Sequence, residues 1–261
     1  MAKEAILTAA ILRVEGLCKS FGGVRAVRDL SFEVGEGEIL GLIGPNGSGK
    51  STTVNTLAGV FPPTSGTIEL AGTQIERLAE YERVSKGLAR TFQTASVFPE
   101  FTVRQQVTLG CNVTLQSHPV SSVFDFGHRS EEDEAIITRV EDVLTLTGLL
   151  AVAHKPVATI TAAEQRFLMI ATALASDPKL LLLDEPAAGL VSHERKTLSE
   201  LIRQVRQRGV SVLVIEHHMA LIMEICDRIV VLNFGSKIAE GTPQVIRSDK
   251  KVIDAYLGET A

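Results

Sequence analysis

The stretch Gly44-Pro45-Asn46-Gly47-Ser48-Gly49-Lys50-Ser51 decides the fold of this 261-residue chain. It fits the pattern G-x-x-x-x-G-K-[ST] without a gap, follows the apolar run from Ile39 to Ile43, and precedes a helical pattern. Its glycines let consecutive backbone N–H groups point into one concavity, and a helix N-terminus adds its positive end. The stretch therefore predicts a phosphate-binding loop between a buried strand and a helix.

Several residues of this loop are candidates for binding a nucleotide. Lys50 can reach the β- and γ-phosphates, and the Ser51 hydroxyl can ligate Mg²⁺. The alternative is a glycine-rich turn that only joins a strand to a helix. This alternative is disfavoured because Lys50 and Ser51 stand at the positions that the motif requires, after an apolar run and before a helical pattern. The nucleotide contacts expected in the loop are Gly44, Asn46, Gly47, Ser48, Gly49, Lys50, Ser51 and Thr52.

The composition is that of a globular protein. The chain is 45% hydrophobic and 22% charged, which suffices for one α/β domain or for a core with a subdomain. A net charge of −5 argues against a nucleic-acid partner, because nucleic-acid-binding surfaces are normally basic. Cys18, Cys111 and Cys226 form no C-x-x-C pair, so a reducing compartment is expected rather than a disulfide framework or a zinc site. The apolar stretch from Ala5 to Leu12 is too short to span a bilayer, so any membrane role is expected to be peripheral.

The first part of the chain predicts a β-rich lobe. Residues 11–15 and 30–34 alternate apolar with polar side chains and are expected to be antiparallel strands. A turn at 19–24 between them carries Phe21. Helix-like segments at 103–115 and 131–147 then predict a helical subdomain inserted into the core.

The second half alternates helices with apolar strands at 180–183, 210–215 and 228–232. This alternation is typical of parallel strands covered on both faces. The expected fold class is α/β, with a mixed sheet core of the P-loop NTPase type, an antiparallel β lobe and the inserted helical subdomain. The nucleotide-binding core with its lobe is placed at residues 1–92 and 159–261, and the helical subdomain at 93–158.

Two carboxylates follow the apolar strand at 180–183. Asp184 and Glu185 stand at the carboxyl end of this strand, where open α/β sheets bind ligands. Asp184 suits a Mg²⁺ ligand, and Glu185 can act as a general base on the attacking water. An acid pair at a strand end often only caps a helix, but its combination with the phosphate loop favours a nucleotide site.

Together these motifs resemble the ATP-binding subunit of ABC transporters, and the resemblance covers nearly the whole chain. It implies that Gln93, in Arg90-Thr91-Phe92-Gln93, contacts Mg²⁺ and the attacking water, and that its loop couples to a membrane partner. It also implies that His217 contacts the γ-phosphate and that Phe21 stacks on adenine. On the residues alone, a surface glutamine, a satisfied imidazole at a strand end and a core phenylalanine remain the alternatives.

Two strings resemble one subgroup of this family, the branched-chain amino-acid importer ATPases. They are Ala89-Arg90-Thr91-Phe92-Gln93 and the tail from Ala239 to Glu259. The resemblance implies ATP and Mg²⁺ as ligands and a second ATPase subunit, identical or different. It also implies membrane permease subunits fed by a periplasmic binding protein, and a peripheral position at the cytoplasmic face of the membrane. The same subgroup serves urea, amides and aromatic acids.

The sequence departs from the family pattern before the strand at 180–183. The signature Leu-Ser-Gly-Gly-Gln stands here as Ile160-Thr161-Ala162-Ala163-Glu164, and in the family this segment contacts the γ-phosphate held by a partner subunit. A Cβ at Ala162 and Ala163 is expected to hinder close approach to phosphate and to disfavour a positive φ. Thr161 and Glu164 also have the spacing of a capping box. The two roles are compatible, because the helix must be capped whatever it touches.

Two further residues depart from the family pattern, at positions that are expected to act across the interface of a dimer. Val191 stands where the family usually has Asp or Asn, and His218 stands where it usually has Asp. These departures lead to the hypothesis that the chain hydrolyses ATP in its own phosphate loop, completed by a partner's signature. Its own signature then completes a degenerate second site at the partner's nucleotide, which binds ATP but hydrolyses it slowly. Losing one hydrogen-bond donor to a transition state costs ~10²–10³ in rate.

Three other functions are compatible with parts of the sequence. A nucleotide-gated dimerisation module would bind ATP without needing turnover, and a lipid or lipopolysaccharide exporter ATPase would share the same core. Soluble ABC ATPases of DNA repair or translation typically carry paired ATPase domains or long inserts. This chain has neither of those features, nor a basic surface signal.

Overall fold

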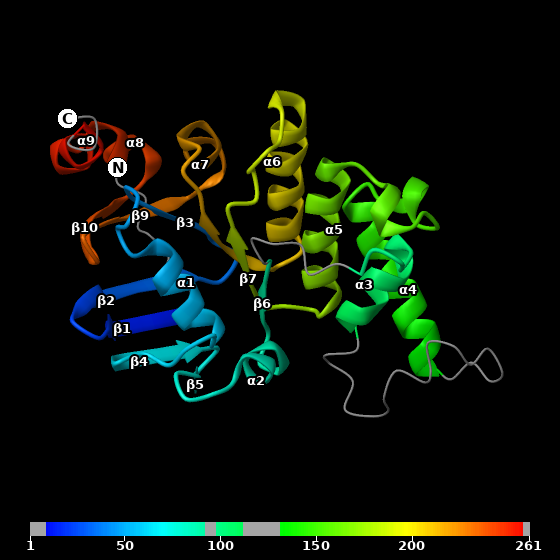
Figure 1. Ribbon diagram of the computed structural model, residues 1–261, viewed down its shortest axis with the longest axis horizontal. Helices are drawn as coiled ribbons and strands as arrows, with labels where there is room; N and C mark the ends of the chain where they lie inside the picture. Colours follow the sequence, from blue (N-terminus) through cyan, green and yellow to red (C-terminus); the bar gives the residue numbers. More distant parts are fainter. Residues whose placement is uncertain (1–8, 92–97, 112–130, 258–261) are drawn as a thin grey trace.

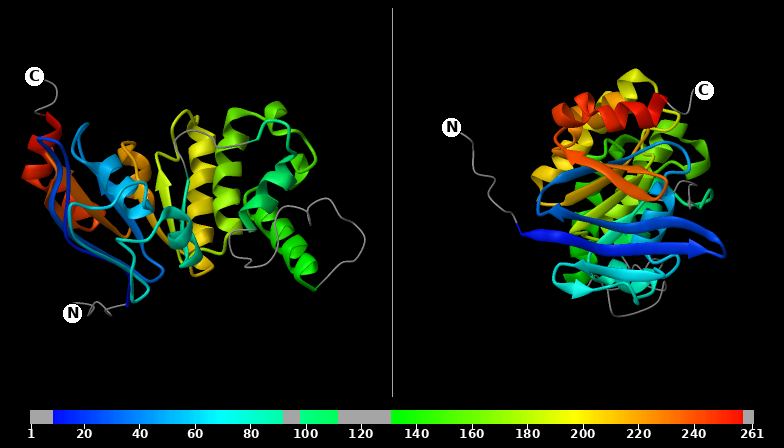
Figure 2. Two further views of the ribbon diagram at one scale, coloured as in Figure 1. Left: turned by 60° about the horizontal axis from the view of Figure 1, so that its bottom comes forward. Right: turned by 90° about the vertical axis from the view of Figure 1, so that its left-hand side faces the viewer.

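The computed structural model describes residues 9–91, 98–111 and 131–257, and in these ranges the strands form two sheets. The first is antiparallel, with the strand order β2-β1-β4-β5. Both sheets lie toward one end of the molecule, and a group of helices lies at the other (Figure 1, Figure 2). The strands of the antiparallel sheet are β1 (Ala10–Phe21), β2 (Val24–Gly35), β4 (Ser65–Leu70) and β5 (Thr73–Gln74).

The hairpin of β1 and β2 is longer than the sequence pattern predicts. Only Gly22 and Gly23 form its turn, and the pairing continues to Phe21 opposite Val24. A two-residue turn with a positive φ of 55° at Gly22 matches the twist of the strands, so the ladder extends to the turn itself. The expected turn at 19–24 is therefore wrong at both ends, because Phe21 ends β1 and Val24 begins β2.

The second sheet carries the phosphate loop and has the order β10-β9-β3-β8-β7-β6. Its strands are parallel except for β10, which pairs antiparallel with β9. This arrangement confirms the mixed sheet core. The bounds of the strands are β3 (Ile39–Ile43), β6 (Leu88–Arg90), β7 (Leu180–Asp184), β8 (Ser211–Ile215), β9 (Arg228–Asn233) and β10 (Ser236–Gly241).

The central strands are apolar throughout because both of their faces are buried. Along β7, Leu180 and Leu182 pack into one hydrophobic cluster, whereas Leu181 and Leu183 pack into another. The first cluster joins this face to the antiparallel sheet and to the helix after the phosphate loop, and the second joins the opposite face to the other helices. Side chains alternate between faces along a strand, so a strand between two such layers needs apolar residues at every position.

The helices occupy both sides of this core. In Figure 2 (left), α6 and α5 stand between the sheets and the pair α3 and α4. The helices are α1 (Lys50–Ala58), α2 (Glu80–Ser85), α3 (Val103–Cys111), α4 (Glu131–Leu146), α5 (Ala162–Ala175), α6 (Ser192–Gln207), α7 (Met219–Ile225), α8 (Pro243–Ser248) and α9 (Lys250–Leu257).

The helical part of the chain packs through apolar faces of α3, α4 and α5. Val107, Leu144 and Leu168 come from these three helices and belong to the same buried cluster. This cluster continues into the sheet, so α5 contributes both to the helical group and to the covering of the core. The boundaries placed at 93 and 158 stay a prediction.

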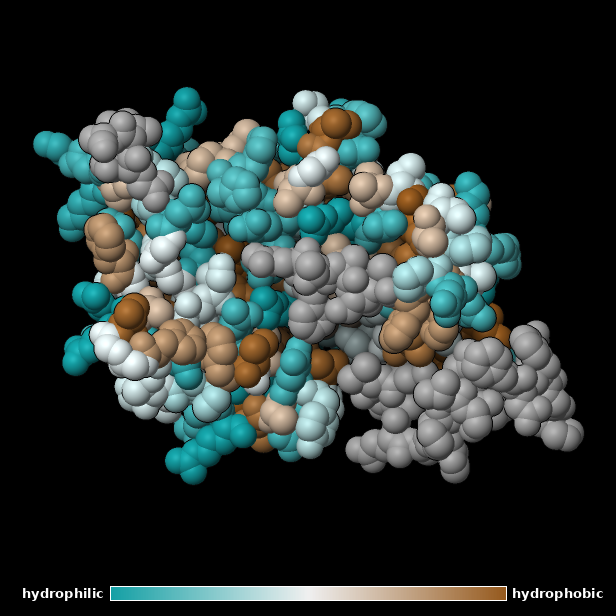
Figure 3. Space-filling view, in the orientation of Figure 1, coloured by the Kyte–Doolittle hydropathy of each residue, from teal (hydrophilic) through white to brown (hydrophobic). Residues whose placement is uncertain are grey.

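The face shown in Figure 3 mixes hydrophilic side chains with small groups of apolar ones. Within the described ranges, none of the helices combines the length and the hydrophobicity that crossing a membrane requires.

Candidate functional site

The phosphate loop has a backbone that only glycine permits at two positions. Gly44 has a φ of 152°, and a Cβ added there would lie 2.2 Å from the carbonyl oxygen of Leu232. Gly49 has a φ of 103°, and its added Cβ would lie 2.6 Å from the carbonyl oxygen of Ala26. Both spaces are filled by backbone, which cannot move aside as a side chain can. The two glycines therefore determine the backbone conformation of the loop, in addition to leaving room for a ligand.

The loop is held from behind by segments far away in the sequence. The N–H of Gly235, in the turn between β9 and β10, donates to the carbonyl of Ser48 at 3.0 Å. The carbonyl of Gly235 in turn accepts from the N–H of Arg28 in β2, at 2.8 Å. The antiparallel lobe, the phosphate loop and the last hairpin of the sheet thus meet at one point.

The polar side chains of the loop fit an anionic ligand. The Lys50 ammonium is buried and donates to the carbonyl oxygens of Gly44 and Pro45, at 2.6 and 2.8 Å. The Ser48 hydroxyl is buried and has no hydrogen-bond partner among the described residues. A lysine and an orphaned hydroxyl at the start of a helix suit a phosphate chain. Ser51 and Asn46 are exposed, and Thr52 is partly buried.

Asp184 ends β7 as a buried carboxylate, and an arginine faces it. One guanidinium nitrogen of Arg90 lies 2.8 Å from Oδ2 of Asp184, and another donates to Oδ1 of Asn55 in α1 at 2.7 Å. Arg90 pairs with Leu182 across β6 and β7, so its side chain points to the same face as that of Asp184. In the sequence, Arg90 stands out only as part of Arg90-Thr91-Phe92-Gln93 and not as a site residue. The signal that could have identified it is a basic residue at the end of one strand and an acidic residue at the end of another.

Glu185 and His217 come together at the carboxyl ends of the neighbouring strands β7 and β8. Nδ1 of His217 lies 3.8 Å from Oε1 of Glu185, with 63% and 34% of the two side chains exposed. Glu185 has a left-handed φ of 49°, and its N–H donates to the carbonyl of Ile215 at 2.9 Å. A non-glycine residue in this region costs of order 1–3 kcal/mol and is typical of functional sites. The turn aims the carboxylate toward the imidazole and leaves both accessible to a ligand.

The aromatic residue expected to stack on adenine lies at the surface. The Phe21 ring is 47% exposed and meets the Phe61 ring edge to face, with 5.1 Å between centroids. The Lys19 ammonium lies 5.0 Å from the Phe21 centroid and donates to the carbonyl of Pro62 at 2.7 Å. Phe21 is therefore not a core residue, which was the alternative. Its role with adenine stays a prediction.

The residues of the altered signature begin α5 in a regular helical conformation. Thr161 is the N-cap, and its hydroxyl accepts from the Glu164 N–H at 3.2 Å, while Oε2 of Glu164 accepts from the Thr161 N–H at 2.7 Å. The predicted capping box is confirmed. Ala162 and Ala163 have negative φ values, so the expected conformational penalty is wrong, because a helical first turn needs no left-handed residue. The steric half of that expectation stays a prediction.

Three further residues singled out in the sequence are Gln93, Val191 and His218. Gln93 lies outside the described residues. Val191 is the N-cap of α6 and is 52% exposed, and its N–H is bound by Oε2 of Glu194 at 2.8 Å. His218 is the N-cap of α7 and makes no side-chain capping hydrogen bond.

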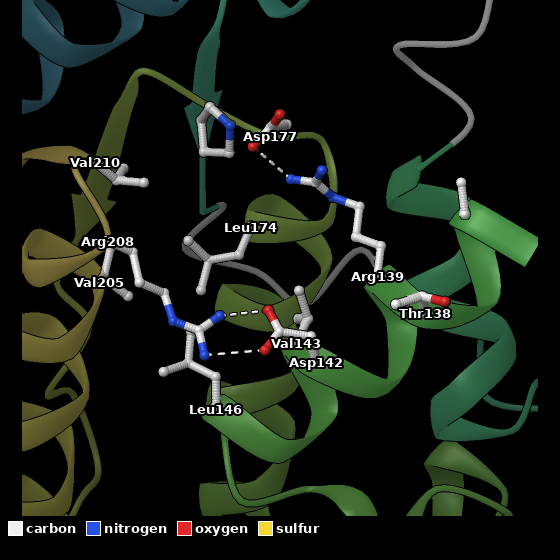
Figure 4. A pocket seen from close by; sticks show the side chains of 12 residues that line it. Thr138, Arg139, Asp142, Val143, Leu146, Leu174, Asp177, Val205, Arg208 and Val210 are labelled. Atoms are coloured by element: carbon white, nitrogen blue, oxygen red, sulfur yellow. Dashed lines mark hydrogen bonds and ion pairs between the residues drawn. The ribbon is translucent and has the colours of Figure 1, made fainter.

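A cavity of about 550 Å³ lies away from these groups, between α4 and the C-terminal ends of α5 and α6 (Figure 4). Two ion pairs cross it, Arg139 with Asp177 and Arg208 with Asp142. Its lining residues Pro178 and Val210 precede β7 and β8, so the cavity lies at the amino ends of the strands. It does not belong to the phosphate-loop site.

Comparison with known proteins agrees with this geometry. Residues 27–188 match the family model described as ABC transporter, and residues 236–261 match that of the branched-chain amino acid ATP-binding cassette transporter. The high-affinity branched-chain amino acid transport ATP-binding protein LivG of Salmonella typhimurium is 41% identical over 95% of this chain and 98% of its own length. The corresponding protein BraF of Pseudomonas aeruginosa is 38% identical over the same shares.

Two further comparisons extend this likeness. The lipopolysaccharide export system ATP-binding protein LptB of Haemophilus influenzae is 32% identical over 96% of this chain and 98% of its own length. The ADP conformation of an ATP-binding cassette of an ABC transporter superposes with a TM-score of 0.83 and 28% identity, covering 96% of this chain and all of that one. The chain therefore belongs to the ABC transporter family and is one of its ATP-binding, ATP-hydrolysing subunits.

Proposed function

We propose that this chain powers an ABC importer of branched-chain amino acids, or of a related small solute, from the cytoplasmic face of the membrane. The relatives described as branched-chain amino-acid transport proteins are 41% and 38% identical, whereas the lipopolysaccharide export protein is 32% identical. The tail at 236–261, whose described part contains β10, α8 and α9, also matches the branched-chain model. Both findings favour the importer over the exporter.

The placement of Glu185 beside His217 is the observation that carries the proposed chemistry. The carboxylate takes a proton from the attacking water as a general base, and the imidazole contacts the γ-phosphate from the neighbouring strand end. Lys50 and the backbone N–H groups of the loop bind the β- and γ-phosphates. Phe21 is 47% exposed and offers an aromatic surface to adenine.

The residues present also fit Mg²⁺. Carboxylate, hydroxyl and amide oxygens are its preferred protein ligands, and Asp184, Ser51 and Gln93 are the proposed set. When bound, the ion neutralises charge that develops on the phosphates. Asp184 is already held in a fixed position by Arg90, so the site presents a preformed carboxylate.

The partners follow from the same proposal. A second ATPase subunit, identical or different, completes the site across a dimer, and the Gln93 loop and the helical part at 93–158 contact the permease subunits. A periplasmic or extracellular binding protein delivers the solute to those permeases. No nucleic-acid partner is proposed, given the net charge of −5.

The altered signature makes this dimer asymmetric in the proposal. Thr161 and Ala162 are exposed at the start of α5, where they would face the partner's nucleotide. Methyl groups at Ala162 and Ala163 keep the helix N-terminus further from phosphate than glycine does. The partner's nucleotide then turns over slowly, while ATP bound to this chain is hydrolysed. ATPase assays of the chain alone and with its partner test this arrangement, and rapid hydrolysis by a homodimer contradicts it.

The substitution Glu185→Gln tests the hydrolytic role. In the complex with permease and partner ATPase, it is expected to abolish turnover at this chain's loop while ATP binding is kept. Unchanged turnover would favour the nucleotide-gated dimerisation module. Glu200→Gln in α6, an exposed carboxylate away from the site, is the matched control and should leave turnover unchanged. Uptake of leucine by proteoliposomes holding the complex separates the importer from an exporter.

A further inference from the structure

Glu216 follows β8 directly and is almost completely buried, with 1% of its surface exposed. Its carboxylate accepts three backbone N–H groups. Oε1 binds the N–H of Ala187 at 2.8 Å, and Oε2 binds those of His217 and His218 at 3.0 Å each. Among the described residues it forms no ion pair with a basic side chain. Both oxygens of this buried carboxylate are therefore bound by backbone N–H groups.

These three donors belong to two different loops. Ala187 lies two residues after Glu185, in the turn that leaves β7, whereas His217 and His218 form the segment between β8 and α7. The turn after β7 is also attached at its start, because the Glu185 N–H donates to the carbonyl of Ile215. The end of β8 thus holds the turn that carries Glu185 at two points, residues 185 and 187.

The chemistry of the contact requires a carboxylate. All three partners are N–H donors, and only a carboxylate offers two oxygens that both accept. A glutamine in the same place would turn its NH₂ group toward a backbone donor and leave at least one N–H unpaired. Aspartate is one methylene shorter, so we expect it to lose the contact with at least one of the two loops.

We propose that Glu216 is a positioning residue for ATP hydrolysis, fixing the separation between Glu185 and His217 by joining the loops that carry them. This inference rests on the proposed hydrolytic role of those two side chains. It goes beyond that role because Glu216 is buried and is not expected to touch the substrate. The 3.8 Å between Oε1 of Glu185 and Nδ1 of His217 is set by the two loops that Glu216 connects.

The test compares Glu216→Gln with the matched substitution Glu38→Gln in the assembled complex. Glu38 is also a largely buried carboxylate, which accepts the N–H of Gly35 and pairs with Arg228, but it lies at the amino end of β3. Glu216→Gln is expected to lower kcat ~10–10²-fold, because a small displacement of reacting groups costs this much. The KM for ATP should stay within about twofold, because Lys50 and the phosphate loop belong to other elements. Glu38→Gln should lower the melting temperature and leave kcat unchanged.

Two further measurements separate positioning from general stability. Amide hydrogen exchange of the nucleotide-free protein should become faster at both 187–190 and 217–218 in Glu216→Gln, but not in Glu38→Gln. In a double-mutant cycle, Glu216→Gln should cost little further activity once His217 is alanine, because the separation that Glu216 fixes has then lost one of its two side chains.

The outcomes are distinct. The inference is overturned if kcat falls no more than in Glu38→Gln, if exchange at 187–190 is unchanged, or if the two losses in the cycle simply multiply. If the wild-type complex shows no hydrolysis that is lost in Glu185→Gln, the proposed function is overturned, and this inference with it. An active wild type with a fully active Glu216→Gln variant overturns the inference alone.

Discussion

Arg90 and Asp184 form an ion pair with 9% and 1% of their side chains exposed, and 2.8 Å separates the guanidinium nitrogen from the carboxylate oxygen. Asn55 holds a second nitrogen of the same guanidinium. Arg90→Met removes the guanidinium that faces the buried carboxylate and is expected to lower the free energy of unfolding by ~3–5 kcal/mol. Urea denaturation of the purified subunit measures this loss.

The control for Arg90 is the exposed pair of Arg203 and Glu224, with 41% and 50% of the side chains exposed. Arg203→Met is expected to cost ~0–1 kcal/mol, because solvent screens such pairs. Equal losses for the two substitutions would contradict the structural role given to Arg90.

Gly49→Ala tests the shape of the phosphate loop. The new Cβ would lie 2.6 Å from the Ala26 carbonyl at a φ of 103°, so we expect a loss of ~2–5 kcal/mol and of nucleotide binding. Gly72 also has a positive φ, 78°, but nothing lies within 4 Å of an added Cβ. Gly72→Ala should therefore cost only the backbone term of ~1–2 kcal/mol and keep nucleotide binding. Fluorescent ATP analogues and thermal unfolding check both variants, and normal binding by Gly49→Ala would sink the prediction.

Val191→Ser should stabilise the protein. Val191 has the extended backbone of an N-cap, φ −80° and ψ 172°, but its side chain offers no acceptor to the first turn of α6. Serine supplies one and completes a capping box with Glu194, for a gain of ~1 kcal/mol. Thr161→Ala makes the opposite change at α5 and should lose a similar amount. Chemical denaturation compares them, and a neutral result at both positions would refute the argument.

The Cys226 thiol gives the protein a pH dependence in alkali. Burial raises the pKa of Cys226 to about 12, with Asp227 and Glu38 adding to the shift, whereas an ordinary thiol has a pKa of 9.0. Between these values the unfolded chain loses a proton that the folded protein keeps, so this contribution to stability falls as pH rises. The difference in unfolding free energy between wild type and Cys226→Ala should be constant below pH 8 and change by about 1 kcal/mol per pH unit above pH 9. Urea titrations from pH 7 to 10 measure it, and a flat difference contradicts the shift.

The parts of the site that sequence reasoning reached are those built from local patterns. The motif at 44–51 follows β3 and runs into the first turn of α1 as predicted, and Asp184 ends β7 with Glu185 directly after it. A run of four leucines is enough to place a strand between two apolar layers, and a strand of known direction places the residues at its end. The capping box of Thr161 and Glu164 was readable for the same reason, since both partners lie within one turn.

What sequence reasoning missed depends on pairs that only the fold brings together. β6 has three residues, too few for a periodic signal, yet it places Arg90 against Asp184. Glu216 reads as a polar residue at a strand end, and nothing in its neighbours predicts that Ala187 donates to it. Phe21 was placed in a turn because Gly22 and Gly23 are strong turn signals, whereas cross-strand pairing extends β1 up to them.

The contact of Gly235 with Ser48 also has a consequence for how the protein is made. The ribosome delivers the phosphate-loop sequence long before it delivers β9 and β10, whose carbonyl at Leu232 and N–H at Gly235 confine the loop. The nascent chain thus carries the complete motif while its backbone is still unconfined. We therefore expect nucleotide binding to be a late event of biosynthesis, and a fragment truncated before residue 228 should keep every residue of the motif without forming the binding loop.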